Sequence, residues 1–133
     1  FGKTYLSNCI AKEILDNNKT VLYQTAPNML DNIISYRFGN NDLKNYYKNL
    51  LDVDLLIIDD LGTESKNDIK FTELFNIINT RSLNENNKIT KTIISTNLNL
   101  HDILNNYDER IFSRIVGEYN ICKFFGEDLR FKK

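Results

Sequence analysis

The sequence has few cysteines and no long apolar run. Cys9 and Cys122 lie far apart and form no CxxC pair, which argues against a zinc or redox site. We expect both to be buried free thiols in a reducing cytosol. The longest purely aliphatic runs, such as that at 55–58, are far below the roughly 20 residues that span a bilayer, and we expect no signal peptide. These absences predict a cytoplasmic protein without a membrane partner.

The sequence also lacks an excess of positive charge. Its formal net charge is −1 and its isoelectric point is near 5.8, so nucleic-acid binding needs a local basic patch or parts of the protein outside this sequence. With 133 residues, 41% of them hydrophobic, the chain is long enough for one core and too short for two. It contains no repeat or linker, so we expect one domain over residues 1–133.

What is present is an alternation of helical and strand patterns. Apolar residues at helical spacing predict helices at 3–16, after Pro27, at about 42–51, from Phe71 to near Asn84, and in two short pieces through Tyr107 and Val116. Runs of β-branched, aliphatic and aromatic residues predict strands at 20–26, 53–62, 91–97 and 120–125. This alternation is typical of an α/β fold in which helices cover both faces of a mostly parallel sheet.

The tripeptide Gly2-Lys3-Thr4, at the head of the first predicted helix, matches the last three positions of the phosphate-binding motif G-x-x-x-x-G-K-[ST]. In that motif Gly2 lets the backbone approach phosphate, Lys3 reaches the β- and γ-phosphates, and Thr4 offers a hydroxyl to Mg²⁺. By itself the tripeptide is also compatible with a chance sequence at the start of an ordinary helix.

Two adjacent carboxylates, Asp59 and Asp60, follow the apolar run of the second predicted strand. Ligands of a parallel α/β sheet bind beyond the carboxyl ends of its strands, and buried carboxylates there need a cation such as Mg²⁺ on a nucleotide. Asp59 would hold the metal and Asp60 would orient the attacking water. The alternative is a solvated turn that caps the next helix, but the order of the motifs favours a nucleotide site.

Further polar residues fit the same site. Asn97 ends the third predicted strand, where its amide can donate to phosphate and accept from water, although a strand-end turn also uses asparagine. Arg110 and Arg114 share one helical face, and a guanidinium there either stabilises transition-state charge in a neighbouring subunit or pairs with nearby carboxylates. Arg130 follows the last predicted strand and can contact the phosphates of its own subunit.

The segments LLIIDDLGTE, IISTNL, ERIFSRI and FFGEDLR occur in this order. Together they resemble the AAA+ ATPase domain of bacterial replicative helicase loaders, the DnaC/DnaI-like group, which includes the transposition helper ATPase IstB. The resemblance covers the chain from Gly2 to its C-terminus. The matched positions are Lys3 and Thr4 of Walker A, Asp59 and Asp60 of Walker B, Asn97 as sensor 1, Arg114 as the arginine finger and Arg130 as sensor 2.

The resemblance implies a P-loop nucleotide-binding fold that binds ATP or ADP with Mg²⁺ and hydrolyses ATP slowly, in an assembly formed through Arg114. It also implies a function in DNA replication, in which the nucleotide state controls loading of the replicative helicase on single-stranded DNA. Most AAA+ proteins have Glu at the position of Asp60, and the shorter side chain implies modest hydrolysis.

The family has a central strand and a helicase-binding domain upstream of the position of Gly2. We therefore expect this sequence to be truncated within the Walker A loop and to lack both. The motifs leave three alternatives: a transposition helper, a P-loop nucleotide kinase, and an inactive nucleotide-fold interaction module. Co-purification with a helicase or with a transposase would separate a loader from a transposition helper.

Aromatic and basic residues alternate in the segment YRFGNNDLKNYYKNL, at 36–50. Such a segment can stack bases and follow the phosphates of single-stranded DNA. It can equally pack some of its aromatic rings and expose the rest to water. The residues of interest are Tyr36, Arg37, Phe38, Tyr46, Tyr47 and Lys48.

Overall fold

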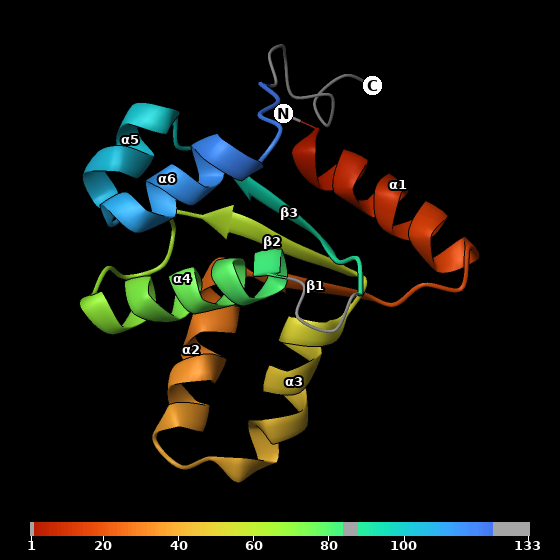
Figure 1. Ribbon diagram of the computed structural model, residues 1–133, viewed down its shortest axis with the longest axis horizontal. Coiled ribbons are helices and arrows are strands. Elements are labelled where there is room, and N and C mark those ends of the chain that lie inside the picture. The colour runs from red at the N-terminus through yellow and green to blue at the C-terminus, as the bar shows by residue number, and fades with distance from the viewer. Residues whose placement is uncertain (1, 84–87, 124–133) are drawn as a thin grey trace, which may run out of the picture.

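The computed structural model describes residues 2–83 and 88–123 of the chain and contains one parallel sheet. Its strands are β1 (Val21–Thr25), β2 (Leu55–Leu61) and β3 (Lys91–Thr96), in the spatial order β1-β2-β3 (Figure 1). The register pairs Val21 with Leu55 and Leu55 with Lys91. The predicted α/β class with a parallel sheet is therefore confirmed.

Helices cover both faces of this sheet. Helix α1 (Lys3–Asp16) lies on one side, and α2 (Ala26–Arg37), α3 (Lys44–Asp52) and α4 (Asp68–Leu83) lie on the other (Figure 1). Helices α5 (Leu100–Asn106) and α6 (Glu109–Glu118) lie toward the carboxyl ends of β2 and β3. A short 3₁₀ helix, η1 (Asn41–Leu43), precedes α3, so the single helix predicted at 42–51 is in fact two elements.

The main hydrophobic core lies between the sheet and the helices opposite α1. Because side chains alternate along a strand, Leu56 and Ile58 of β2 face this core, while Leu55 and Ile57 face α1. Each fully buried leucine or isoleucine contributes roughly 1.5–3 kcal/mol to stability. Fully or nearly fully buried core residues from the covering helices are Met29, Leu30, Ile33, Leu74, Ile77, Ile78, Ile111 and Ile115.

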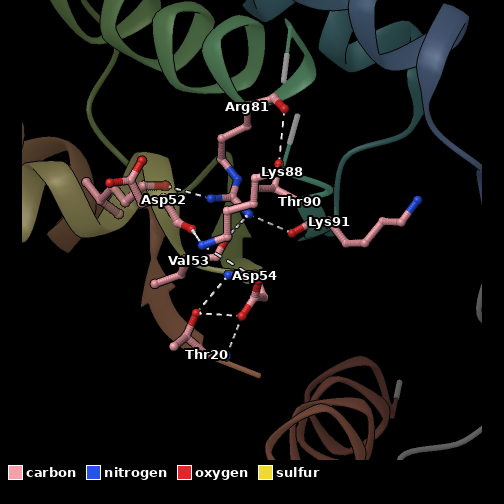
Figure 2. Close-up of polar contacts among 9 residues, drawn as sticks. Thr20, Asp52, Val53, Asp54, Arg81, Lys88, Thr90 and Lys91 are labelled. Atoms are coloured by element: carbon pink, nitrogen blue, oxygen red, sulfur yellow. Dashed lines mark hydrogen bonds and ion pairs between the residues drawn. The ribbon is translucent and has the colours of Figure 1, made fainter. Parts of the chain in front are cut away.

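Arg81 of α4 joins the amino-terminal ends of two strands, as Figure 2 shows. Its guanidinium donates to the carbonyl oxygens of Leu50 and Val53 at 2.9 Å and of Lys91 at 2.8 Å, and to Thr92 Oγ1 at 2.9 Å. The residue is 4% exposed, and this burial lowers its pKa to about 10. Arg81 therefore fixes α4 against the end of α3 and the starts of β2 and β3.

Three details differ from the sequence prediction. The described part of the predicted fourth strand, residues 120–123, is not a strand, and 124 and 125 lie outside the described residues. Cys9 and Cys122 are both exposed free thiols rather than buried ones, because Cys9 lies on the outer side of α1 and Cys122 lies in this irregular segment. Within the described residues, none of the helices has the length and apolar character needed to cross a membrane.

Candidate functional site

The amino-terminal end of α1 presents backbone N–H groups to one end of the sheet. Gly2 precedes the helix in a left-handed conformation, with φ of 78°, which glycine adopts without strain. No side chain caps the helix, and its first turn contains no acidic residue. An uncapped helix N-terminus with its positive dipole end favours an anion such as phosphate.

Two hydrogen bonds connect this helix to the carboxyl ends of β2 and β3. Lys3 Nζ donates to Asn97 Oδ1 at 3.1 Å, just after β3, and Thr4 Oγ1 donates to Asp59 Oδ2 at 3.3 Å, near the end of β2. The structure therefore brings four of the predicted site residues together, although they come from three distant segments. It places a cation, an amide, a hydroxyl and a carboxylate at one edge of the sheet.

The Asp59 carboxylate accepts more hydrogen bonds than any other described side chain of the site. Its side chain is buried, and besides Thr4 it accepts hydrogen bonds from Tyr23 Oη, Ser95 Oγ and the backbone N–H of Asp60. Burial raises the pKa of Asp59, but these donors outweigh burial and hold the pKa below its usual range. The site is therefore built to keep Asp59 ionised.

The sequence prediction missed Tyr23 and Ser95 as partners of Asp59. Parallel pairing sets Tyr23 beside Ile57 and Thr25 beside Asp59, so the Tyr23 side chain lies on the Asp59 face, two residues away. The alternation of side chains along β1 and β3 was the available signal, since both hydroxyls lie in predicted strands. The hydrogen bond to Asp59, together with burial, raises the pKa of Tyr23 to about 12.

Asp60 differs from Asp59 in exposure and backbone geometry. The pairing of β2 with β3 shifts register between Ile58 and Leu61, so the two aspartates lie in a β-bulge. Asp60 has φ of 59°, a left-handed conformation that is uncommon outside glycine, and it is exposed. The bulge therefore separates a buried carboxylate from an exposed one at adjacent positions.

The oxygen donors of Thr4 and Asp59 fit a magnesium ion held mainly by a nucleotide. Mg²⁺ prefers hard oxygen ligands and is usually bound through one or two carboxylates, water and substrate phosphates. Within the described residues no group of three or more His, Cys, Asp or Glu side chains is arranged to hold a metal. This donor set agrees with a metal that arrives with a phosphate ligand.

The three predicted arginines differ in their surroundings. Arg114 of α6 forms an ion pair with Glu118, one turn later, at 2.7 Å, and its side chain is one-third exposed. Arg110 pairs with Asp108 at 2.7 Å and lies over the Phe75 ring, 4.7 Å from its centre. Arg130 lies outside the described residues. The predicted roles of Arg114 and Arg130 stay predictions.

The aromatic and basic segment is partly used for internal packing. The Tyr36 and Tyr47 rings stack with their centres 5.2 Å apart, and Arg37 lies over the Tyr47 ring and pairs with Glu73 at 2.9 Å. Phe38 is 77% exposed, and Lys48 is exposed. Of the residues predicted to contact nucleic acid, Arg37, Phe38 and Lys48 are exposed, but the Arg37 guanidinium is already bound to Glu73.

Comparison with known sequences identifies related proteins. Residues 1–121 match the family model of the bacterial DnaA ATPase domain. The chain is 34% identical over 119 residues to the chromosomal replication initiator protein DnaA of Streptococcus mutans serotype c (strain ATCC 700610 / UA159). This alignment covers 85% of the chain and 25% of the relative, so the chain spans about a quarter of that protein's length.

Two solved structures share the fold. The replication initiator DnaA bound to AMPPCP and single-stranded DNA has a TM-score of 0.68 at 23% identity, covering 87% of this chain and 34% of that one. The DnaC helicase loader has a TM-score of 0.73 at 20% identity, covering 90% of this chain and 70% of that one. These similarities confirm the predicted AAA+ P-loop fold.

Proposed function

The chain belongs to the bacterial DnaA ATPase domain family, and we propose that it is the ATP-binding and ATP-hydrolysing domain of a cytoplasmic protein that initiates DNA replication. The observation that carries this proposal is the convergence of Lys3, Thr4, Asp59 and Asn97 at one edge of the sheet. Family membership favours replication over the transposition and nucleotide-kinase alternatives.

Each residue of the site has a chemical role in this proposal. The N-terminus of α1 and Lys3 bind the phosphates, and Thr4 with Asp59 would hold Mg²⁺. Bound Mg²⁺ neutralises charge on the β- and γ-phosphates. Asp60 is exposed and can orient the attacking water, while Asn97 lies beside Lys3, where its amide can contact the γ-phosphate.

The test is nucleotide binding by the full-length protein and its Lys3→Ala variant, measured by titration with a fluorescent ATP analogue and Mg²⁺. We expect the variant to lose binding, because it lacks the cation that meets the phosphates. A matched control is Lys12→Ala, which removes a lysine of the same helix that lies more than two turns from its N-terminus. Undiminished binding by Lys3→Ala would remove the proposal.

Helicase loading is the second candidate function. The order of the motifs LLIIDDLGTE, IISTNL and ERIFSRI resembles the helicase loader group. An initiator and a loader both need ATP binding, so the nucleotide site does not separate them. The replicative helicase would bind through regions outside this chain, and self-association would use Arg114 of α6.

The two candidates predict different complexes of the full-length protein. A loader forms a stoichiometric complex with the replicative helicase hexamer in the presence of ATP, which size-exclusion chromatography with light scattering would detect. An initiator without loading activity elutes separately from the helicase under the same conditions. Co-elution with a transposase instead would favour the transposition helper.

Single-stranded DNA is a further proposed ligand, through exposed residues at the end of α2 and in α3. Phe38 can stack on a base and Lys48 can contact a phosphate, whereas Arg37 is already bound to Glu73. We expect Phe38→Ala to weaken binding by about 1–3 kcal/mol, the usual contribution of one stacked base. Lys48→Ala should reduce the salt dependence of binding, and unchanged affinity and salt dependence in both variants would exclude this surface.

A further inference from the structure

The loop that follows Asp60 contains a buried carboxylate that has no cationic partner among the residues the structure describes. Glu64 is 6% exposed, and its Oε2 accepts a hydrogen bond from the backbone N–H of Gly62 at 2.8 Å. Its Oε1 accepts a hydrogen bond from the hydroxyl of Tyr107, which is 5% exposed. Burying a carboxylate costs free energy unless hydrogen-bond donors satisfy its oxygens. The two donors therefore hold the Glu64 side chain in this position.

The same loop fixes the backbone of Asp60. The carbonyl oxygen of Asp60 accepts hydrogen bonds from the backbone N–H of Thr63 at 3.2 Å and from its hydroxyl at 2.9 Å. Gly62 has φ of 105°, and a Cβ there would lie 2.7 Å from Leu98 Cδ1. These contacts leave the loop little room to change conformation. Through Tyr107, the Glu64 side chain connects the loop to the junction between α5 and α6.

Tyr107 lies at the junction between α5 and α6. Its ring packs against Phe71 of α4, with ring centres 5.2 Å apart. Its hydroxyl is protonated and can donate at neutral pH, as in any tyrosine, and burial and the nearby Glu64 raise its pKa further. Helix α6 begins two residues later and carries Arg114.

We propose that Glu64 is a positioning residue that ties the Asp60 loop to the start of α6, so that Asp60 and the helix carrying Arg114 are held in one arrangement. This inference rests on the proposed ATPase function. When a neighbouring subunit binds Arg114 and moves α6, the hydrogen bond between Tyr107 and Glu64 would transmit that movement to the loop of Asp60, the carboxylate that orients water.

The first test is Tyr107→Phe in the full-length protein, which removes the hydroxyl and keeps the ring against Phe71. We expect kcat for ATP hydrolysis to fall by about tenfold or more, because small displacements of a catalytic group are costly. The dissociation constant for ATP should change by less than about twofold, since the phosphate-binding residues are untouched. Unchanged kcat would overturn the proposal.

A matched control is Tyr46→Phe. It removes another tyrosine hydroxyl, one that donates to Gln24 Oε1 at 2.7 Å away from the Asp60 loop. We expect this variant to keep the wild-type kcat. An equal loss of kcat in both variants would indicate general destabilisation and would contradict a positioning role. Glu64→Gln, which keeps an acceptor oxygen but not the charge, should have an intermediate kcat.

A second measurement does not depend on hydrolysis. In ¹⁵N-labelled, nucleotide-free protein, Tyr107→Phe should shift the backbone amide resonances of Asp60 and Gly62, and Tyr46→Phe should not. Absence of these shifts would overturn the proposal even in a protein that binds no ATP. If the wild-type protein did not bind ATP, that result would contradict the proposed function but not the positioning role of Glu64.

The connection to Arg114 is tested by a double-mutant cycle. If Tyr107 and Arg114 act through one unit, the double variant Tyr107→Phe/Arg114→Ala should lose little more kcat than the more damaging single variant. If the fold-losses of kcat in the two single variants multiplied in the double variant, the two residues would act independently, and the proposed coupling would be overturned.

Discussion

Lys3 Nζ and Asn97 Oδ1 are 3.1 Å apart, although 94 positions separate the two residues in the sequence. The contact places the amide of Asn97 within reach of any anion that Lys3 binds. The Asn97 side chain is exposed, so it is free to contact a ligand at this edge.

Asn97→Ala should retain ATP binding and lose hydrolysis by about 10²-fold, the usual cost of removing one transition-state donor. Lys3 and the N-terminus of α1 still bind the phosphates in this variant, so the loss should appear in kcat rather than in the dissociation constant. Steady-state kinetics and nucleotide titration measure the two. Asn105→Ala, which removes an exposed asparagine of α5, is the control. Equal loss of binding and hydrolysis would make Asn97 a binding residue instead.

Tyr23→Phe should raise the pKa of Asp59, because it removes one of the donors that keep this pKa low. A lowered folded-state pKa stabilises the protein above the unfolded value of about 3.9, and this stabilisation is lost as the pH falls through the folded-state pKa. The variant should thus be less stable at pH 7, and the difference should shrink on acidification below about pH 4.

The measurements are a ¹³C titration of the Asp59 carboxyl group and urea unfolding at several pH values. Tyr5→Phe removes a hydroxyl from a residue that is 76% exposed and serves as the control. A stability difference that stays constant from pH 7 to pH 3 would contradict the linkage to Asp59.

Arg81→Ala should lower the free energy of unfolding by about 3 kcal/mol, because it leaves buried carbonyl oxygens without their donor. Arg81→Lys should also destabilise the protein, since one ammonium group cannot replace the planar fork of donors. Urea unfolding measures both. Lys91→Ala, which keeps the backbone carbonyl that Arg81 contacts, should change stability by less than about 0.5 kcal/mol. If Lys91→Ala lowered the free energy of unfolding by a similar amount, the hydrogen bonds of Arg81 would not be the source of the stability.

The sequence predicted most elements of the fold well because these elements have a strong local signal. Helix α1 has the predicted bounds, and the buried run of β2 leads directly to Asp59. The alternation of side chains along β1 and β3 indicated which hydroxyls share a face, but which of them meet Asp59 depends on strand register and on the bulge at Asp60. The segment at 120–123 has strand-forming residues but pairs with none of the described strands, since a strand needs a neighbouring strand as well as propensity.

The exposure of Cys9 has a similar physical origin. The sequence predicted a helix at 3–16 and a buried Cys9, yet Cys9 is exposed, and its helical neighbours Leu6 and Ile10 are 44% and 36% exposed. In the described residues only Ser7 of this helix is buried. Periodicity identifies which residues share a face, but how much of that face is covered depends on the rest of the structure.

Arg114→Ala should leave ATP binding unchanged and reduce hydrolysis only in assembled protein. Where an arginine acts from a neighbouring subunit, it stabilises transition-state charge and contributes about 10³-fold or more to the rate. In the described structure Arg114 pairs with Glu118 of its own helix, so assembly must either break or share this exposed ion pair. Glu118→Gln, which frees Arg114, should therefore hydrolyse ATP at least as fast as the wild type.

The measurement is the rate of hydrolysis per subunit as a function of protein concentration, for wild type, Arg114→Ala and Arg110→Ala. Arg110 is the matched control, because it lies one turn earlier on α6 and is already bound by Asp108 and the Phe75 ring. The wild-type rate should rise with assembly, Arg110→Ala should follow it, and Arg114→Ala should stay at the monomer rate. An equal loss for Arg114→Ala in dilute monomeric protein would mean that the residue acts within its own subunit.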